Sequence, residues 1–233
     1  MHWDDKKEVS RTKDGLLFLS LGAIVGSVPL LGIGFVGEII AVIGAILPIL
    51  GREAFGEKHS KYVLVSTVIY LVGFLITAIF ALAFTDSLVS TTASPTSNDA
   101  LKASLSNSFN QFLIGAFIGS IISGGGQVLF TYRIQNKRGR VFLWTGYAST
   151  LAVGIIILLA IMPQISTALV QAFSNGSYDA SPLLALQSQT DAFRLLNIVP
   201  GVIFALGYYS ALVRIRMGEA LRSNSSLSRA ARV

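Results

Sequence analysis

Glu38 is the residue of this sequence whose type and position are most typical of chemistry inside a membrane. It is the only charged residue in the apolar run Gly15–Leu50. A carboxyl group in hydrocarbon is costly unless it is neutral, paired or hydrated, so such residues mark ion pairs or ion paths. Arg194 begins the last apolar segment from the side on which Glu38 is expected, which makes Glu38 and Arg194 a candidate intramembrane ion pair. The alternative is a Glu38 carboxylate at the membrane interface, in contact with water.

Two glycine-rich segments have the spacing of nucleotide-binding motifs but not their context. Residues 32–37 match G-x-G-x-x-G, which binds a dinucleotide only between a strand and a helix. The flanks here are apolar and helical in pattern, so we interpret these glycines as a turn between closely packed helices. Residues 51–58 resemble a phosphate-binding loop, yet Glu57 stands where the lysine is required. The sequence therefore predicts no cofactor.

Metal and catalytic side chains are scarce. The chain has no cysteine, and its two histidines, His2 and His59, lie in polar segments. Intramembrane catalysis usually needs facing clusters of His, Asp, Glu or Cys. We therefore predict neither a metal site nor catalytic residues, and we expect no enzyme.

Composition is typical of a membrane protein. Hydrophobic residues make up 52% of the 233 residues and charged residues only 13%, with a mean hydropathy of +0.66. A soluble domain carries roughly 25% charged residues, so lipid must cover much of this chain. The net charge of +6 predicts contact with membrane lipids and no nucleic acid, because the basic residues gather beside the apolar segments.

The apolar segments predict the architecture. A spanning helix needs about 20 apolar residues, and about 62–84, 111–132, 142–162 and 193–213 meet this length. The run 15–50 is too long for one span, and Pro29 and Gly32 lie near its middle, which predicts a short hairpin. We therefore expect an all-α integral membrane protein with a short N-terminal helical hairpin and four long transmembrane helices. The length of the hairpin leaves open whether its helices cross completely.

Basic residues predict the orientation. All but Lys102 and Arg194 of the 18 Lys and Arg residues fall into residues 1–14, 51–61, 133–140 and 214–233. The positive-inside rule places these segments, and both termini, on the cytoplasmic side of a cell membrane. The expected parts are a cytoplasmic segment 1–14, a Gly-rich membrane hairpin 15–51, a four-helix domain 62–214 with outer loops 85–110 and 163–192, and a basic Ser-rich tail 215–233.

Glycines spaced for close helix packing occur in two apolar segments. They form the G-x-x-x-G pairs Gly22 with Gly26 and Gly115 with Gly119. Small residues four apart let another helix approach closely, and we favour packing within the chain over homodimerisation. A triplet follows the second pair: Gly124, Gly125 and Gly126. It fits a close helix crossing, with a kink or a hinge as the alternatives.

A faint internal repeat is present. Residues 62–133 overlie residues 143–214 without a gap, which places Gly73 on Gly154 and Gly126 on Gly207. The two blocks would be tandem hairpins related as a parallel repeat. The alternative is that shared hydropathy alone produces the match.

The two outer loops are poor in charge and rich in small polar residues. We expect residues 87–98 to be irregular, whereas residues 100–112 and 165–173 could extend the adjoining helices. Asn175-Gly176-Ser177 is a glycosylation sequon on the second loop, so Asn175 is a candidate N-glycosylation site in a host that glycosylates.

Two stretches carry a resemblance to a known family. One is the hairpin pattern Leu21-Gly22, Gly26-Ser27, Leu30-Leu31-Gly32, Gly37 and Ile43-Gly44; the other is Arg138-Gly139, Phe142, Gly146 and Gly154. In these features the chain resembles a family of small archaeal multi-pass membrane proteins of unknown function. The resemblance implies an archaeal source and no known activity.

The function we expect is that of a non-catalytic membrane protein. It would be a structural or accessory subunit, or a scaffold, in contact with other membrane-protein subunits or with itself. A small transporter or channel is the first alternative, suggested by the tandem hairpins, the glycine triplet and Glu38. A membrane-embedded enzyme is the second alternative.

Overall fold

The computed structural model describes residues 3–28, 33–93, 98–173, 179, 181–182, 184–185 and 195–230. Within these residues every regular element is a helix, and four helices are long and apolar enough to cross a membrane. A shorter helical hairpin precedes them. The predicted fold class is therefore confirmed, and the chain is a membrane-embedded helical protein.

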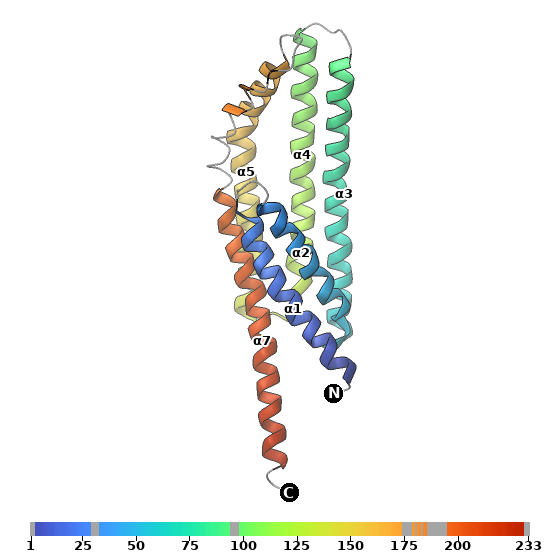
Figure 1. Ribbon diagram of the computed structural model, residues 1–233, viewed down its shortest axis with the longest axis vertical. Coiled ribbons are helices and arrows are strands. Elements are labelled where there is room, and N and C mark those ends of the chain that lie inside the picture. Colours follow the sequence, from blue (N-terminus) through green and yellow to red (C-terminus); the bar gives the residue numbers. More distant parts are fainter. Residues whose placement is uncertain are drawn as a thin grey trace. The chain divides into compact units, whose positions relative to one another are not determined.

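The helices are longer than the apolar segments that predicted them (Figure 1). In chain order the elements are α1 (Trp3–Gly26), α2 (Ile33–Leu50), the 3-10 helix η1 (Arg52–Phe55), α3 (Glu57–Ala93), α4 (Asn98–Thr131), α5 (Lys137–Phe173), the 3-10 helix η2 (Leu195–Asn197) and α7 (Ile198–Ala230). The candidate spans are Glu57–Ser90, Ala103–Thr131, Lys137–Ile165 and Leu195–Gly218, and each overlaps a span predicted from the sequence. Residues 29–32, at the predicted hairpin turn, lie outside the described residues.

Residues 87–93 are helical, so the prediction of an irregular segment there is wrong. Hydroxyl groups in and just before this segment donate to carbonyls of the same helix. Ser90 Oγ donates to the Ser87 carbonyl at 3.1 Å, and Thr85 Oγ1 donates to the Ala81 carbonyl at 2.9 Å. The start of α4 at Asn98 and the end of α5 at Phe173 agree with the expected helix extensions.

The chain divides into two compact units, and each is described by itself. The first unit comprises Met1–Thr67, Gln127–Tyr147 and Ile198–Val233, and the second comprises Val68–Gly126 and Ala148–Asn197. Helices α1, α2 and α7 belong to the first unit, whereas α3, α4 and α5 contribute residues to both.

In the first unit, α1 and α2 form an antiparallel hairpin with almost no side chains between the two backbones. A methyl group added to Gly22 would lie 2.6 Å from the Ala41 backbone nitrogen, and Gly37 faces the backbone of Gly26 in the same way. Carbon atoms in ordinary contact lie at least 3.4 Å apart, so only hydrogen fits at these positions. The small residues thereby allow the close approach that G-x-x-x-G spacing favours in membranes.

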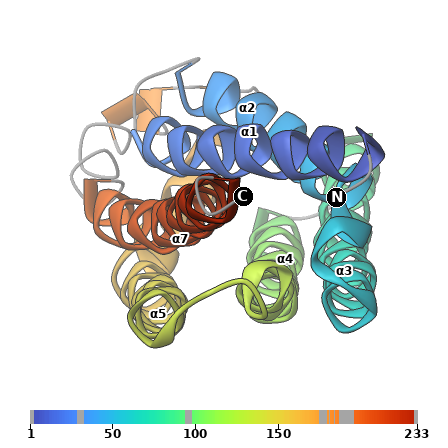
Figure 2. The same ribbon diagram turned by 90° about the horizontal axis from the view of Figure 1, so that it is seen from below.

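The core of the first unit lies where α1 and α7 meet, near the ends of the longer helices. Figure 2 shows α1 lying against both α2 and α7. At this contact Gly201 of α7 packs on Ser27, which directly follows α1, with 2.5 Å between an added methyl group and the Ser27 Cβ. The buried apolar residues are Val9, Leu16, Leu19, Val63, Val128, Phe130, Ile134, Leu143, Phe204, Tyr208, Ala211, Leu212 and Ile215.

In the second unit, α3 and α4 pack antiparallel through contacts that recur every three or four residues. Glycines make the contacts at one end, where Gly73 meets Ser123 and Gly119 meets Thr77. Further along, Gly115 lies against the ring of Phe80. The series then continues through aromatic rings and ends at a hydrogen bond: Phe84 with Phe112 at 5.5 Å between centroids, Phe84 with Phe109 at 5.6 Å, and Ser87 Oγ with Ser108 Oγ at 2.6 Å.

The internal repeat would place Gly73 on Gly154. Both residues meet α4, Gly73 at Ser123 and Gly154 at Phe117. The repeat stays a prediction from the sequence.

Candidate functional site: a polar joint at the α4–α5 turn

A group of polar contacts joins the α4–α5 turn to α7, within the first unit. We name it the polar joint and define it by Thr131, Gln135, Asn136, Gly139, Gly207, Ser210 and Arg214. The sequence places helix-capping chemistry here, because Asn136 directly precedes α5. Asn136 Oδ1 accepts a hydrogen bond from the Gly139 backbone N–H at 2.7 Å, which is the geometry of a helix N-cap. The same oxygen accepts a hydrogen bond from Ser210 Oγ at 3.2 Å.

Gln135 is the buried centre of the polar joint, with 1% of its surface exposed. Its Nε2 donates to the Gly207 carbonyl of α7 at 2.8 Å and to Thr131 Oγ1 at 3.3 Å. Its Oε1 has no hydrogen-bond donor among the described residues. A methyl group added to Gly139 would clash with this oxygen and would lie 2.8 Å from Ser210 Oγ. Position 139 therefore accommodates glycine and no larger residue while Gln135 stays in place.

Arg214 fastens the next turn of α7 to the same segment. Its Nη1 donates to the carbonyls of Ile134 at 3.0 Å and Gln135 at 2.6 Å. These carbonyls follow the C-terminal end of α4, where the helix dipole favours a cation. The α7 residues of the joint, at 207, 210 and 214, are three and four residues apart and so share one helix face.

A stack of two tyrosines and two arginines lies beside the polar joint. The rings of Tyr62 and Tyr132 stack with centroids 6.4 Å apart and planes 10° from parallel. The Arg133 guanidinium lies 5.4 Å from the Tyr62 centroid, and that of Arg140 lies 4.6 Å from the Tyr132 centroid. Arg140 Nε also donates to the Tyr132 carbonyl at 3.2 Å. Cation–π contacts of this kind stabilise each guanidinium at the end of an apolar helix.

The hydrogen bonds of the polar joint hold helices of the chain together. Its donors are amide, hydroxyl and guanidinium groups, and their acceptors are carbonyl and side-chain oxygens of the same chain. The described residues also contain no group of three or more His, Asp or Glu side chains that could hold a metal ion. Nothing in the joint activates a nucleophile, since general acid–base work needs a titratable group within hydrogen-bond reach.

The structure places Glu38 on the exposed side of α2, among the exposed apolar residues Val36, Ile39 and Val42. Arg194 lies outside the described residues, so the predicted Glu38–Arg194 pair stays a prediction. Asn175, the candidate glycosylation site, also lies outside them.

The predicted packing glycines contact neighbouring helices to different extents. Gly22, Gly26, Gly115 and Gly119 contact a neighbouring helix of this chain. In the triplet, Gly124 and Gly126 are buried, whereas a methyl group added to Gly125 would meet no atom within 4 Å. The triplet lies inside the continuous helix α4.

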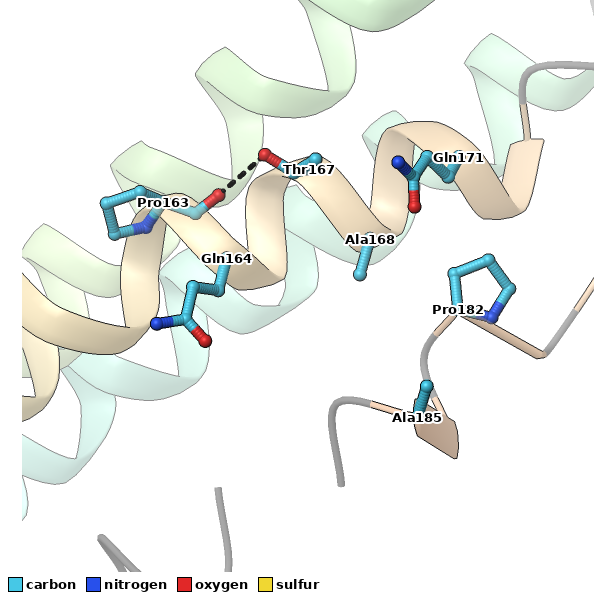
Figure 3. A pocket seen from close by; sticks show the side chains of 7 residues that line it. All are labelled: Pro163, Gln164, Thr167, Ala168, Gln171, Pro182 and Ala185. Atoms are coloured by element: carbon cyan, nitrogen blue, oxygen red, sulfur yellow. Dashed lines mark hydrogen bonds between the residues drawn. The ribbon is translucent and has the colours of Figure 1, made fainter. Parts of the chain in front are cut away.

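An open hollow of about 440 Å³ adjoins α5 in the second unit. Figure 3 shows Gln164, Thr167 and Gln171 on the α5 side and Pro182 and Ala185 opposite. The Thr167 hydroxyl donates to the Pro163 carbonyl at 2.9 Å. No charged side chain lines this hollow among the described residues, so its walls offer a charged ligand no counter-ion.

Asp179 makes a backbone hydrogen bond to the last turn of α5. The Asp179 backbone N–H donates to the Ala172 carbonyl at 2.9 Å, and the Asp179 carboxylate accepts from the Ser181 backbone N–H at 2.9 Å. Hydrogen bonding to the Ser181 backbone, and then to its side chain, lowers the pKa of Asp179 below its usual value. The carboxylate therefore stays ionised at neutral pH.

Sequence reasoning missed the polar joint. Gln135, Asn136 and Ser210 carry no motif, and only the N-cap position of Asn136 could have been read locally. It also missed the burial of His59, which is 3% exposed and packs edge-on against Phe55 at 5.4 Å between ring centroids.

Comparison with protein-family models, with curated proteins and with solved structures finds no match for this chain. The resemblance to small archaeal membrane proteins therefore stays a prediction from the glycine pattern.

Proposed function

We propose that the chain is a non-catalytic membrane protein that serves as a structural or accessory subunit of a membrane assembly. The polar joint is the observation that carries this proposal. The buried amide of Gln135 and the guanidinium of Arg214 form hydrogen bonds that hold α7 to the α4–α5 turn. The best-built polar site of the described chain thus stabilises the helix arrangement itself.

Hydroxyl groups within the spans support the same proposal. Ser66 Oγ donates to the Val63 carbonyl at 2.8 Å, Ser120 Oγ to the Phe117 carbonyl at 2.7 Å, and Thr77 Oγ1 to the Gly73 carbonyl at 3.2 Å. Each bond returns to the same helix, so these donors are not presented to a solute.

A small transporter or channel is the second candidate, and Glu38 is the observation that favours it. An exposed carboxylate on an apolar helix face is costly in lipid, and such residues commonly belong to ion paths. Under the subunit proposal, Glu38 instead contacts water at the membrane surface or a basic group of a partner.

Purification in mild detergent from native membranes, followed by flux measurements in vesicles, separates the two candidates. The subunit proposal predicts a complex of fixed stoichiometry and no proton or cation flux above that of empty vesicles. Flux that Glu38→Gln abolishes, and that the exposed-acid control Glu53→Gln leaves intact, would establish transport and overturn the proposal. A chain that purifies as a lone monomer would overturn it as well.

A further inference from the structure

The first turns of α5 present cations and apolar side chains on one exposed surface. Lys137 and Arg138 are exposed at the start of the span Lys137–Ile165. One and two turns further on, Val141 is 58% exposed and Trp144 is 50% exposed. Lys137, Val141 and Trp144 are four and then three residues apart, so they share a face of the helix. The opposite face, with Gly139, Leu143 and Gly146, is buried.

The two cations have no counter-ion in the described structure. Residues 100–178 contain neither Asp nor Glu, and the ion pairs Arg52–Glu53 and Lys61–Glu57 involve other cations. The neighbouring guanidinium groups of Arg133 and Arg140 are held in place over tyrosine rings, which adds fixed positive charge nearby. This surface therefore favours a negatively charged occupant.

We propose that Lys137 and Arg138 bind the phosphate headgroup of an anionic phospholipid whose acyl chains lie along Val141 and Trp144. The seven helical steps from Lys137 to Trp144 cover about 10 Å at 1.5 Å per residue, which carries the surface from headgroup depth into the acyl region. A lipid has the phosphate and the hydrocarbon that this surface requires, in the same order. The proposal does not depend on the accessory role of the chain, only on α5 spanning the membrane.

The chain offers its own reporter for this site. Its tryptophans are Trp3 and Trp144, so Trp3→Phe leaves Trp144 as the single tryptophan. The single-tryptophan full chain would be reconstituted in vesicles of phosphatidylcholine and phosphatidylglycerol, with bromine on the acyl chains of one lipid or the other. Bromine quenches tryptophan fluorescence on contact, so the two quenching curves give the relative affinity of each lipid for the Trp144 surface.

Each cation near an anionic surface contributes about 1 kcal/mol, or about fivefold in affinity, so two cations give at most about 25-fold. We expect the phosphatidylglycerol preference to exceed fivefold at low salt, to fall as salt screens the charges, and to approach unity in Lys137→Gln with Arg138→Gln. The charge-conserving exchange Lys137→Arg with Arg138→Lys should keep the preference. The matched control Lys58→Gln with Lys61→Gln, which removes equal charge from exposed positions of α3, should leave the preference at Trp144 unchanged.

Four results would overturn the proposal. Equal quenching by both lipids in the parent chain would show that no selective site exists. An unaltered preference in the double glutamine variant, folded by circular dichroism, would assign the selectivity elsewhere. Displacement of the lipid by millimolar glycerol phosphate would indicate a site for soluble phosphate, and displacement by an acidic peptide would indicate a protein partner.

Discussion

Replacement of Gly37 by alanine gives the strongest test of the α1–α2 hairpin. The new methyl carbon would clash with the backbone of Gly26 and lie 2.6 Å from the Val25 carbonyl carbon, well inside the 3.4 Å of ordinary contact. Backbone atoms cannot rotate away, so the two helices must separate. Overpacking of this kind costs about 1–3 kcal/mol, and the helix propensity gained from alanine returns up to about 1 kcal/mol. We expect a net destabilisation of about 1–2 kcal/mol.

Gly125→Ala is the matched control, because the same chemical change there meets no atom within 4 Å. It keeps only the propensity gain and should stabilise the protein by about 0.5–1 kcal/mol. The two variants should therefore differ by about 1.5–3 kcal/mol, or about 12- to 150-fold in the unfolding equilibrium constant. Unfolding in mixed micelles with rising dodecyl sulfate, followed by circular dichroism, measures both. A Gly37→Ala protein as stable as its parent would refute the backbone contact between α1 and α2.

Three further predictions concern the polar joint and the orientation. Gly139→Ala should lower the stability by about 1–3 kcal/mol, because the new methyl group clashes with Gln135. Adding Gln135→Ala to the same chain should recover part of this stability, and strictly additive effects in a double-mutant cycle would contradict the contact. Arg214→Gln should lower the stability by about 1.5–3 kcal/mol in the same micelle titration, because two carbonyls lose a charged donor. The control Arg216→Gln, at an exposed position of α7, should change the stability by less than about 0.5 kcal/mol. Equal losses of stability in the two variants would disprove the role of Arg214. Because the chain has no native cysteine, Ser181→Cys should react with an impermeant maleimide added outside cells and Ser60→Cys only after permeabilisation, and the reverse pattern would reject cytoplasmic termini.

The fold class followed from the sequence because hydropathy is a local property. A transmembrane helix can be recognised from a single apolar stretch of sufficient length, and α3, α4, α5 and α7 each contain such a stretch. The ends of the helices were less predictable. Residues 87–98 were expected to be irregular because they are rich in Ser and Thr, yet the Ser90 hydroxyl donates to the Ser87 carbonyl within α3, which composition does not reveal.

The packing glycines could be predicted from local sequence, whereas the polar joint could not. Gly22 with Gly26, and Gly115 with Gly119, were recognisable because both members of each pair lie on one helix. Gln135 could not be recognised, because its partner Gly207 lies 72 residues away along the chain. The two ends of this bond come together only when α7 returns to the α4–α5 turn, so it is a consequence of topology.

The distribution of polar bonds bears on the choice between a subunit and a transporter. In the described α3–α4 contact an interhelical hydrogen bond joins Ser87 and Ser108, near the far ends of the two helices. Closer to the middle, Ser120 and Ser123 bond to carbonyls of α4 itself, and Gly73 and Gly119 bring the backbones together. A solute crossing there would have to break intrahelical bonds and separate glycine-packed backbones, since hydrocarbon offers no replacement donors. Removal of the hydroxyl by Ser123→Ala should therefore change the stability by less than about 0.6 kcal/mol, which is the average for a polar contact between membrane helices. Replacement of a hydrogen by a methyl group in Gly119→Ala should cost more. The larger loss would show that close packing holds α3 to α4.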